Sequence, residues 1–552
     1  MQAIAFEQAF SLLQRQLVNA AAAGPNRIAM LTETVGQNLS TLFSTVLAQY
    51  GAHAPLVYEP YAVESLKAAY NTGFGQSILP GYRLDRADLL VGFGADFLET
   101  WLSPVEYARK FKAMNAVSGG QKGRFVHVGP YQSLTGANAD KWIACRPGSE
   151  AALILALVRG VMNKGRGLAL PPPFRSAMQQ LARPYTPEKA ASVTDVPAED
   201  IRRLVAALLK ARRPLVLPTQ TTAHGAASLA ADLGTVLLNL LLDPQCTRFD
   251  FDQRHQVETA NPLGDVRRLL FDSAASAPSV LLLHNVNPAY TFPDGDRLAE
   301  KLDGGRQFVI AFSNFMDETA AAADLVFPTR MPLESWDAYE SKLALVSTLQ
   351  PAAGPINDAP QIGDVFLRLL PPGMQWGASY KQFLMQRLAD RKIYDSKEQW
   401  LQLIQSGGRF VADRPATHPD PILGPETVAA LGKNLAASMK GQQGAITLQV
   451  APSLRFFDGR GSNRPWLPEI PEAISQVSWQ TMAFVSAARM QQNAWSDGDV
   501  LKLESQHGQV EAQVYGYSGL HADVAVIPAG QGHTRYGRYA TDQGVNPLKL
   551  LG

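Results

Sequence analysis

Residues 88–96 read Asp-Leu-Leu-Val-Gly-Phe-Gly-Ala-Asp, a continuous apolar run that ends in a glycine-rich turn. Such a run is typical of a buried strand of a parallel sheet, because both faces of that sheet are covered. Similar runs occur at 27–32, 55–58 and 124–128, and stretches with helical spacing of apolar residues separate them. This alternation predicts βαβ units, in which helices cover both faces of a parallel sheet.

A second series of the same kind follows the proline-rich stretch 171–173. Its apolar runs at 214–218, 279–284 and 307–312 alternate with helical stretches such as 226–242. Ligands of such sheets usually bind beyond the carboxyl ends of the strands. We therefore expect a ligand crevice between the two series.

The fold class that we expect is α/β, with two doubly wound, Rossmann-like units at residues 1–170 and 171–350. A helical return segment at 351–440 is predicted to pack on the first unit. From 441 to 552, short runs of alternating polarity are separated by turn residues. That pattern is typical of a small closed β-barrel, which would be the last domain.

The charges of the chain nearly cancel. Its 552 residues include 50 Lys and Arg against 49 Asp and Glu, a net charge of +1. This balance gives no attraction to nucleic acid or to an anionic bilayer. No apolar run approaches the roughly 20 residues of a membrane span, and the N-terminus lacks the basic start of a signal peptide. We therefore expect no membrane span and no signal peptide in the chain as given. A chain that had been processed or truncated would show the same N-terminal pattern.

Only two cysteines occur, Cys145 and Cys246. A protein-held iron–sulfur cluster generally needs four thiolates, so this chain alone is not expected to hold one. The nine histidines show no spacing typical of a zinc pair. Residues 317–319 resemble the cap at the start of a helix, so we expect a structural role for them. We predict two buried free thiols, no metal ligand and no catalytic residue.

Two turns are candidates for ligand binding. Gly94 and Asp96 end an expected strand, where backbone N–H groups could bind a phosphate. The third glycine of the dinucleotide fingerprint is missing there, and an ordinary strand-end turn explains the residues too. Asn285 and Asn287 occupy the matching place after 279–284. Their amides could bond the edge of a pterin or nucleotide, and Asx turns explain them equally well.

Four collinear segments carry a family resemblance. They are PLVLP with its following LLNLLL helix, LLLHNVNPAYTFPD, FVIAFSNFMDETAAAADLVFPTRMPLESWDAYES, and the C-terminal pair DGDVLKLESQHGQVEAQVY and VAVIPAGQGHTRYGRYATDQGVNPLKLL. Together they resemble the molybdopterin oxidoreductases of the dimethyl sulfoxide reductase superfamily. The resemblance implies a C-terminal pterin-binding barrel, and it places Gly94, Asp96, Asn285, Asn287, Gln531 and His533 around the cofactor.

Within that superfamily, LLVGFGADFLETWLSPVEYARKF, PLESWDAYES and GQGHTRYGRYATDQGVNP resemble the large molybdopterin-type subunit of alternative complex III and of the related quinone reductase complex. The resemblance implies three partners: an iron–sulfur subunit, a multihaem cytochrome c subunit, plus an integral membrane subunit of the polysulfide-reductase type. It also implies a peripheral position on a membrane complex, on the periplasmic face of the inner membrane.

The sequence departs from the catalytic members of the superfamily. It has no N-terminal Cys-x-x-Cys segment, and residues 67–75 offer no thiolate, carboxylate or serine where those enzymes bind molybdenum. We therefore expect no cofactor bound by this chain, with the six positions above as a vestigial pterin site. The alternative is a bound molybdenum bis-pterin guanine dinucleotide.

Two functions follow. The first is a non-catalytic core subunit that scaffolds an iron–sulfur subunit in a quinone-linked respiratory electron-transfer complex. The second is an active molybdenum or tungsten oxidoreductase, acting on polysulfide, thiosulfate or formate, that a separate iron–sulfur subunit supplies with electrons. A third, weaker interpretation is a fragment of a longer fused polypeptide. The electron donor and acceptor are not encoded in any motif of the sequence.

Overall fold

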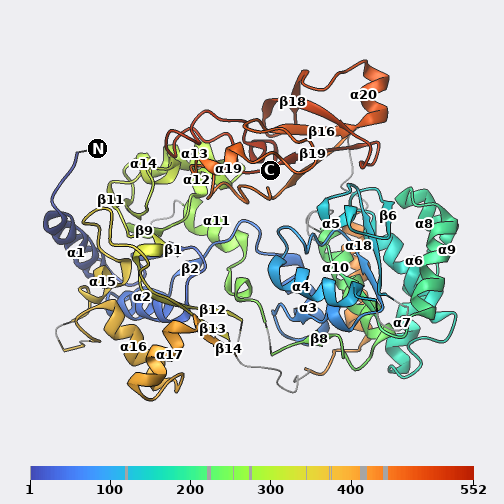
Figure 1. Ribbon diagram of the computed structural model, residues 1–552, viewed down its shortest axis with the longest axis horizontal. Coiled ribbons are helices and arrows are strands. Elements are labelled where there is room, and N and C mark those ends of the chain that lie inside the picture. The colour runs from blue at the N-terminus through green and yellow to red at the C-terminus, as the bar shows by residue number, and fades with distance from the viewer. Residues whose placement is uncertain are drawn as a thin grey trace.

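The computed structural model describes residues 2–117, 122–219, 226–252, 254–272, 277–342, 345–371, 373–374, 376–410, 419–438 and 446–552. Figure 1 shows two lobes side by side, each built around a sheet, with the C-terminal domain (residues 446–552) lying across both. We call them the first lobe, at the left, and the second lobe, at the right.

The first lobe contains a five-stranded parallel sheet in the order β11-β10-β9-β1-β2. Its strands are β1 (Ile28–Thr32), β2 (Leu56–Val57), β9 (Val280–His284), β10 (Phe308–Phe312) and β11 (Leu325–Phe327). Successive residues of these strands are buried in separate clusters on opposite faces, Met30 and Leu282 on one face and Leu31 and Leu281 on the other. Both faces are covered, which explains the continuous apolar runs.

Three separate stretches of the chain supply the helices of the first lobe. They are α1 (Phe6–Ala22), α2 (Gln37–Gln49), α11 (Leu263–Phe271), α12 (Pro288–Thr291), α13 (Gly295–Asp303), α14 (Glu318–Ala321), α15 (Ile362–Leu367), α16 (Tyr380–Asp390) and α17 (Lys397–Gln405). A small antiparallel sheet of β12 (Asp337–Lys342), β13 (Leu345–Leu349) and β14 (Gly408–Phe410) packs against α16 and α17.

The second lobe has a four-stranded parallel sheet in the order β6-β5-β4-β7. Its strands are β4 (Leu89–Gly92), β5 (Arg124–Gly129), β6 (Lys141–Ala144) and β7 (Pro214–Leu217), and β3 (Gly81–Tyr82) pairs with β8 (Phe249–Asp250) beside it. The helices are α3 (Glu64–Phe74), α4 (Pro104–Asn115), α5 (Leu134–Ala137), α6 (Glu150–Met162), α7 (Pro172–Ala182), α8 (Pro187–Thr194), α9 (Ala198–Lys210), α10 (Ala226–Leu242) and α18 (Pro425–Ser438).

The strand pairing corrects the predicted division of the α/β region at residue 170. β1 pairs along its whole length with β9, from Ile28 with Val280 to Thr32 with His284, and β7 pairs with β4. The chain therefore leaves the first lobe after β2, builds the second lobe, and returns to complete the first sheet. The alternation of strands and helices gives their order along the chain, but the partner of each strand depends on long-range packing.

The helical segment after residue 350 also differs from the prediction. Its α15 packs on α2 in the first lobe, whereas its α18 packs on α10 and α7 in the second lobe. The segment therefore joins the two lobes and does not return to one unit only. Residues 372, 375, 411–418 and 439–440 of this segment lie outside the described part of the chain.

The C-terminal domain is a curled five-stranded mixed sheet in the order β15-β19-β16-β18-β17. Its elements are β15 (Thr447–Ala451), α19 (Trp466–Glu469), β16 (Met482–Ser486), α20 (Ala487–Asn493), β17 (Val500–Glu504), β18 (Gln509–Tyr517) and β19 (Val524–Pro528). Within the residues described, the two end strands β15 and β17 are not paired with each other, so the sheet is open where a closed barrel was predicted. In the described residues, no helix has the length and apolar character needed to cross a membrane.

Candidate functional site

A cavity of about 200 Å³ lies between the carboxyl ends of the first lobe's strands and the C-terminal domain. Glu33 follows β1, Asn285 and Asn287 follow β9, and residues 313–317 follow β10. The C-terminal domain closes the other side with residues 458–460, Arg464, His533 and Tyr536. The cavity thus occupies the place where open parallel sheets usually bind their ligands.

The two asparagines after β9 connect the loops of neighbouring strands. Asn287 donates through Nδ2 to Glu318 Oε2 (2.7 Å), and its Oδ1 accepts from the N–H (3.1 Å) and hydroxyl (2.8 Å) of Thr319. Asn285 has a φ of +49° and donates through Nδ2 to Glu33 Oε1 (2.9 Å). Asparagine tolerates this left-handed conformation better than most residues, which suits it to the sharp turn.

Glu318 fastens the C-terminal domain to the first lobe. Its Oε1 accepts from the backbone N–H groups of Thr534 (2.8 Å) and Arg535 (3.2 Å), and His533 Nδ1 lies 3.2 Å from both carboxylate oxygens. Burial alone would raise the pKa of Glu318. The hydrogen bond and positive charge of His533, with the amide of Asn287, outweigh burial and lower the pKa to about 2.

His533 is held in an aromatic stack. Its ring lies 3.7 Å from that of Tyr290 and 4.7 Å from that of Tyr536, measured between centroids. The imidazole is 2% exposed, and its Nε2 has no hydrogen-bond partner among the described residues. An unsatisfied buried nitrogen is costly, so a ligand or water that bonds to it would be stabilised.

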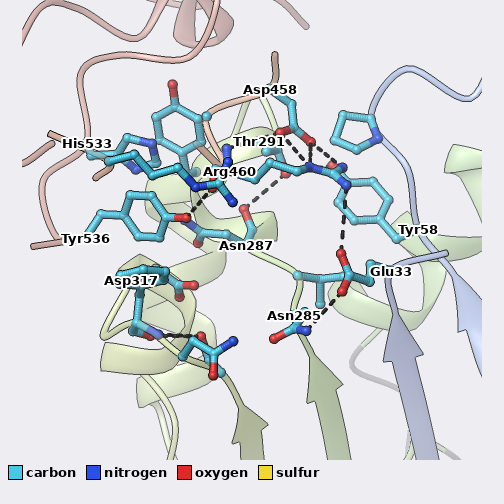
Figure 2. Close-up of a pocket in the computed structure, with 18 of the residues that line it drawn as sticks. Glu33, Tyr58, Asn285, Asn287, Thr291, Asp317, Asp458, Arg460, His533 and Tyr536 are labelled. Carbon is cyan, nitrogen blue, oxygen red and sulfur yellow. Dashed lines mark hydrogen bonds and ion pairs between the residues drawn. The ribbon is translucent and has the colours of Figure 1, made fainter. Parts of the chain in front are cut away.

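The opposite side of the cavity is charged. Arg460 contacts Asp458 (2.6 Å), Glu59 (2.7 Å) and Glu33 (3.8 Å), so one guanidinium faces three carboxylates. Figure 2 shows Arg460 with Asp458 and Glu33, above Asn285. Burial raises the pKa of Glu33 to about 7, although Arg460 partly opposes the shift. Glu33 can therefore hold or release a proton near neutral pH.

A second carboxyl with a raised pKa lies across the cavity. Asp317 caps the N-terminus of α14 by accepting from the N–H of Ala320 (2.8 Å). This confirms the helix cap predicted for residues 317–319. Burial raises the pKa of Asp317 to about 7, in spite of the hydrogen bond from Ala320.

The structure brings together only part of the predicted site. Asn285, Asn287 and His533 line the cavity. Gln531 lies behind this wall, where its backbone carbonyl accepts from the Tyr290 hydroxyl (2.8 Å) and its side chain bonds to Thr481 and Trp479.

Gly94 and Asp96 lie in the second lobe, outside the lining of this cavity. Gly94 has a φ of +84°, so the turn after β4 needs a glycine there. The Asp96 carboxylate accepts from the Ser133 hydroxyl, which ties this turn to the start of α5.

The sequence did not single out Glu33 or Arg460. Glu33 directly follows a predicted strand. That position could have marked it as a candidate, because ligands bind beyond the carboxyl ends of parallel strands. Arg460 comes from a loop of the C-terminal domain, and no local pattern relates that loop to β1. Asp317 and Glu318 were noticed only as helix-capping residues.

The lining residues fit a pterin ring better than a larger ligand. The amides, the carboxyls and the unsatisfied His533 Nε2 offer both donors and acceptors to a ring edge, and Tyr536 adds an aromatic face. Ligand pockets typically measure about 300–1,000 Å³, so 200 Å³ is small for a dinucleotide. No group of three or more metal-ligating side chains occurs in the described residues.

The chain is similar to proteins that are named for molybdopterin. No protein-family model matches it. It is 25% identical to the menaquinone reductase molybdopterin-binding-like subunit of Nitratidesulfovibrio vulgaris, over 99% of this chain and 79% of that protein. A shorter region, 21% of this chain and 15% of the relative, is 33% identical to the thiosulfate reductase molybdopterin-containing subunit of Salmonella typhimurium.

Among solved structures, acetylene hydratase from Pelobacter acetylenicus has a similar fold, with a TM-score of 0.71 at 13% identity. The match covers 100% of this chain and 86% of that protein. These findings confirm the resemblance to the molybdopterin oxidoreductases. They also contradict the expectation that this chain binds no cofactor, because two of the similar proteins are named for binding or containing molybdopterin.

Proposed function

We propose that this chain, which resembles the molybdopterin oxidoreductases along its whole length, is the molybdopterin-type subunit of a quinone-linked redox complex. The observation that carries the proposal is the relation to the menaquinone reductase subunit, which extends over 99% of the chain. A relation of this extent includes both lobes and the C-terminal domain. It therefore covers every segment that lines the cavity.

In this proposal the cavity holds a pterin ring of the cofactor. Asn285 and Asn287 supply amide donors and acceptors, and Asp317 supplies a carboxyl that is neutral over part of the physiological pH range. His533 Nε2 supplies the buried group that still lacks a partner. A bound molybdenum or tungsten pterin would supply two-electron redox chemistry. The residues of this chain orient its ring and exclude water from it.

We further propose that the chain serves as a scaffold and does not turn over substrate itself. Cys145 and Cys246 are both free and buried, and neither lines the cavity. Burial raises the pKa of both thiols, so neither is a ready thiolate ligand. Electron transfer would then run through an iron–sulfur subunit, and the further partners would be a multihaem cytochrome and an integral membrane protein, with the complex on the periplasmic face.

The alternative is an active enzyme for sulfur compounds. It is favoured by the local similarity to the thiosulfate reductase protein and by a region 29% identical to a sulfite dehydrogenase subunit of Allochromatium vinosum, which spans 29% of this chain. In that case the cavity residues would be essential for turnover, because they would hold the reacting cofactor.

Asn287→Ala separates the two functions. The variant removes the amide that connects Glu318 and Thr319 at the cavity wall. With a scaffold role, the assembled complex should lose bound pterin and keep nearly all of its quinone-linked electron transfer. If turnover is abolished while every subunit assembles normally, the active enzyme is the correct function. Pterin content, subunit stoichiometry and quinone reduction are measured on the same preparation.

A further inference from the structure

An exposed apolar surface lies on the C-terminal domain, around the short helix α19. Its members are Leu454, Trp466, Ile470 and Trp479, which we call the tryptophan patch. Trp466 is 73% exposed and Trp479 is 42% exposed, although tryptophan is normally well buried. Exposed large side chains gathered in one place commonly mark an interaction site.

Backbone and side-chain hydrogen bonds hold the patch together. The N–H of Ile470 donates to the carbonyl of Trp466 (3.2 Å), and the N–H of Trp479 donates to the carbonyl of Pro468 (3.0 Å). Arg455, which follows Leu454, donates to the carbonyl of Ile470 (2.7 Å). The four exposed apolar residues therefore lie close together in one folded segment.

Three exposed arginines border the patch. Arg464 lies two residues before Trp466 and also lines the mouth of the cavity. Arg535 and Arg538 belong to the loop whose Tyr539 N–H donates to the side chain of Asn463 (3.1 Å). None of the three arginines forms an ion pair with a described residue. Exposed guanidinium groups of this kind fit carboxylates, which they can bind through two parallel hydrogen bonds.

The composition of this surface fits a protein better than a lipid. Residues 454–480 and 533–543 contain five arginines and no lysine. Arginine, tryptophan and tyrosine are enriched at protein interfaces, whereas lysine is depleted there. The same segments expose the carboxylates of Glu469 and Asp542, which an anionic membrane would repel.

We propose that the tryptophan patch and its arginine border form the docking surface for a partner subunit that presents carboxylates around an apolar centre. The patch is continuous with the cavity mouth through Arg464. A partner docked there would cover the mouth, which would bring it close to any group that the cavity holds. This proposal rests on the proposed function only for the existence of a partner subunit.

Hydroxyl-radical footprinting of the full chain tests the proposal. The chain is tagged and purified from its native membranes as a complex, and it is also prepared alone. In the complex, oxidation of Trp466 and Trp479 should fall about tenfold, because interface anchors are desolvated. Equal oxidation of both residues in the complex and in the isolated chain would overturn the proposal.

A variant pair gives an independent readout. W466A/W479A should retain the other subunits about thirtyfold more weakly in a dilution series, as expected for the loss of interface anchors. Leu401→Ala, an exposed apolar residue on α17 in the first lobe, is the matched control and should retain them fully. Undiminished retention by W466A/W479A would refute the docking surface.

Two further outcomes would also overturn the proposal. The first is binding of the isolated wild-type chain to phosphatidylglycerol vesicles that W466A/W479A abolishes, which would assign the patch to lipid. The second is self-association of the isolated chain that the same variant abolishes. Recovery of the wild-type chain without any other subunit would instead refute the proposed function, so the two failures are distinguishable.

Discussion

Glu318 is one of the residues that join the first lobe to the C-terminal domain. It accepts hydrogen bonds from Asn287 in one and from the backbone of Thr534 in the other, and its carboxylate faces the buried His533. Removing one partner of a buried charged pair leaves the other uncompensated. Loss of the Glu318 carboxylate should therefore weaken the domain contact, which the ion pairs of Arg460 and the hydrogen bond from Tyr290 to Gln531 also support.

Glu318→Gln should lower the free energy of unfolding by about 2–4 kcal/mol, because His533 loses its charged partner. Folding lowers the pKa of Glu318, so its ionised carboxylate stabilises the wild-type protein above about pH 4.5. This contribution to the free energy of unfolding should be lost as the pH falls from about 4.5 toward 2. Denaturant titrations measure both effects. Glu300→Gln, on the exposed face of α13, should change stability by less than about 0.5 kcal/mol. An equally small change in Glu318→Gln would contradict this role.

Asp317 gives the opposite dependence on pH. Folding raises its pKa from 3.8 to about 7, so the contribution of this group to stability is full below about pH 4 and falls as the pH rises to 7. Asp317→Asn keeps the cap of α14 and removes the titration. The variant should therefore gain about 2–4 kcal/mol relative to wild type between pH 4 and 8. Melting curves at both pH values test this, with the exposed Asp303→Asn as the control. A constant difference between variant and wild type would refute the assignment.

For the candidate site, the sequence predicted some of the residues that line the cavity and missed others. Asn285 and Asn287 stand directly after a recognisable strand, and His533 lies in a segment that resembles the C-terminal domain of the family. Gly94 and Asp96 follow an equally clear strand, but that strand belongs to the other lobe. Equivalent positions in two sheets look alike in sequence, and the fold decides which ones share a cavity.

Among the elements, α10 shows how a buried polar residue completes a sheet. β7 is an edge strand, and Asn239 of α10 bonds to its backbone at Val216, accepting from the N–H (3.0 Å) and donating to the carbonyl (2.8 Å). The side chain is 4% exposed. The amide thus pairs with backbone groups that a further strand would otherwise bond, which explains a polar residue at this buried position of α10.

Asn239→Leu should destabilise the protein by about 2–5 kcal/mol, because two buried backbone groups of Val216 lose their partner. The measurement is the free energy of unfolding by denaturant. Asn493→Leu, at an exposed position of α20, makes the same chemical change and should have an effect near zero. If the two variants were equally stable, the edge-strand role of Asn239 would be wrong.

The elements themselves were largely predictable. The run at 27–32 is β1 (Ile28–Thr32), the run at 214–218 is β7, and the helix expected at 226–242 is α10. The hairpin of β12 and β13 was missed, because β12 carries charged residues such as Asp337 and Glu340. Short strands with mixed polarity have no period that separates them from loops.

For the whole molecule, the fold class could be predicted from the sequence but the pairing of strands could not. The two lobes were expected to follow one another, and in the structure the second is inserted into the first. A crossover between parallel strands needs at least about a dozen residues and has no fixed upper length. The alternation of strands and helices along the chain therefore does not determine which strands pair. The C-terminal domain then lies across both lobes (Figure 1). It also closes the cavity on the first lobe with residues such as Arg460 and His533.

The most direct test of the proposed function is the composition of the complex that contains this chain. The tagged chain is purified from native membranes, its pterin is released by oxidation and measured by fluorescence, and its metal is measured by mass spectrometry. We expect pterin in stoichiometric amount with the chain, further subunits in fixed ratio, and electron transfer to or from a quinone. A chain recovered alone and free of pterin would contradict the proposed function.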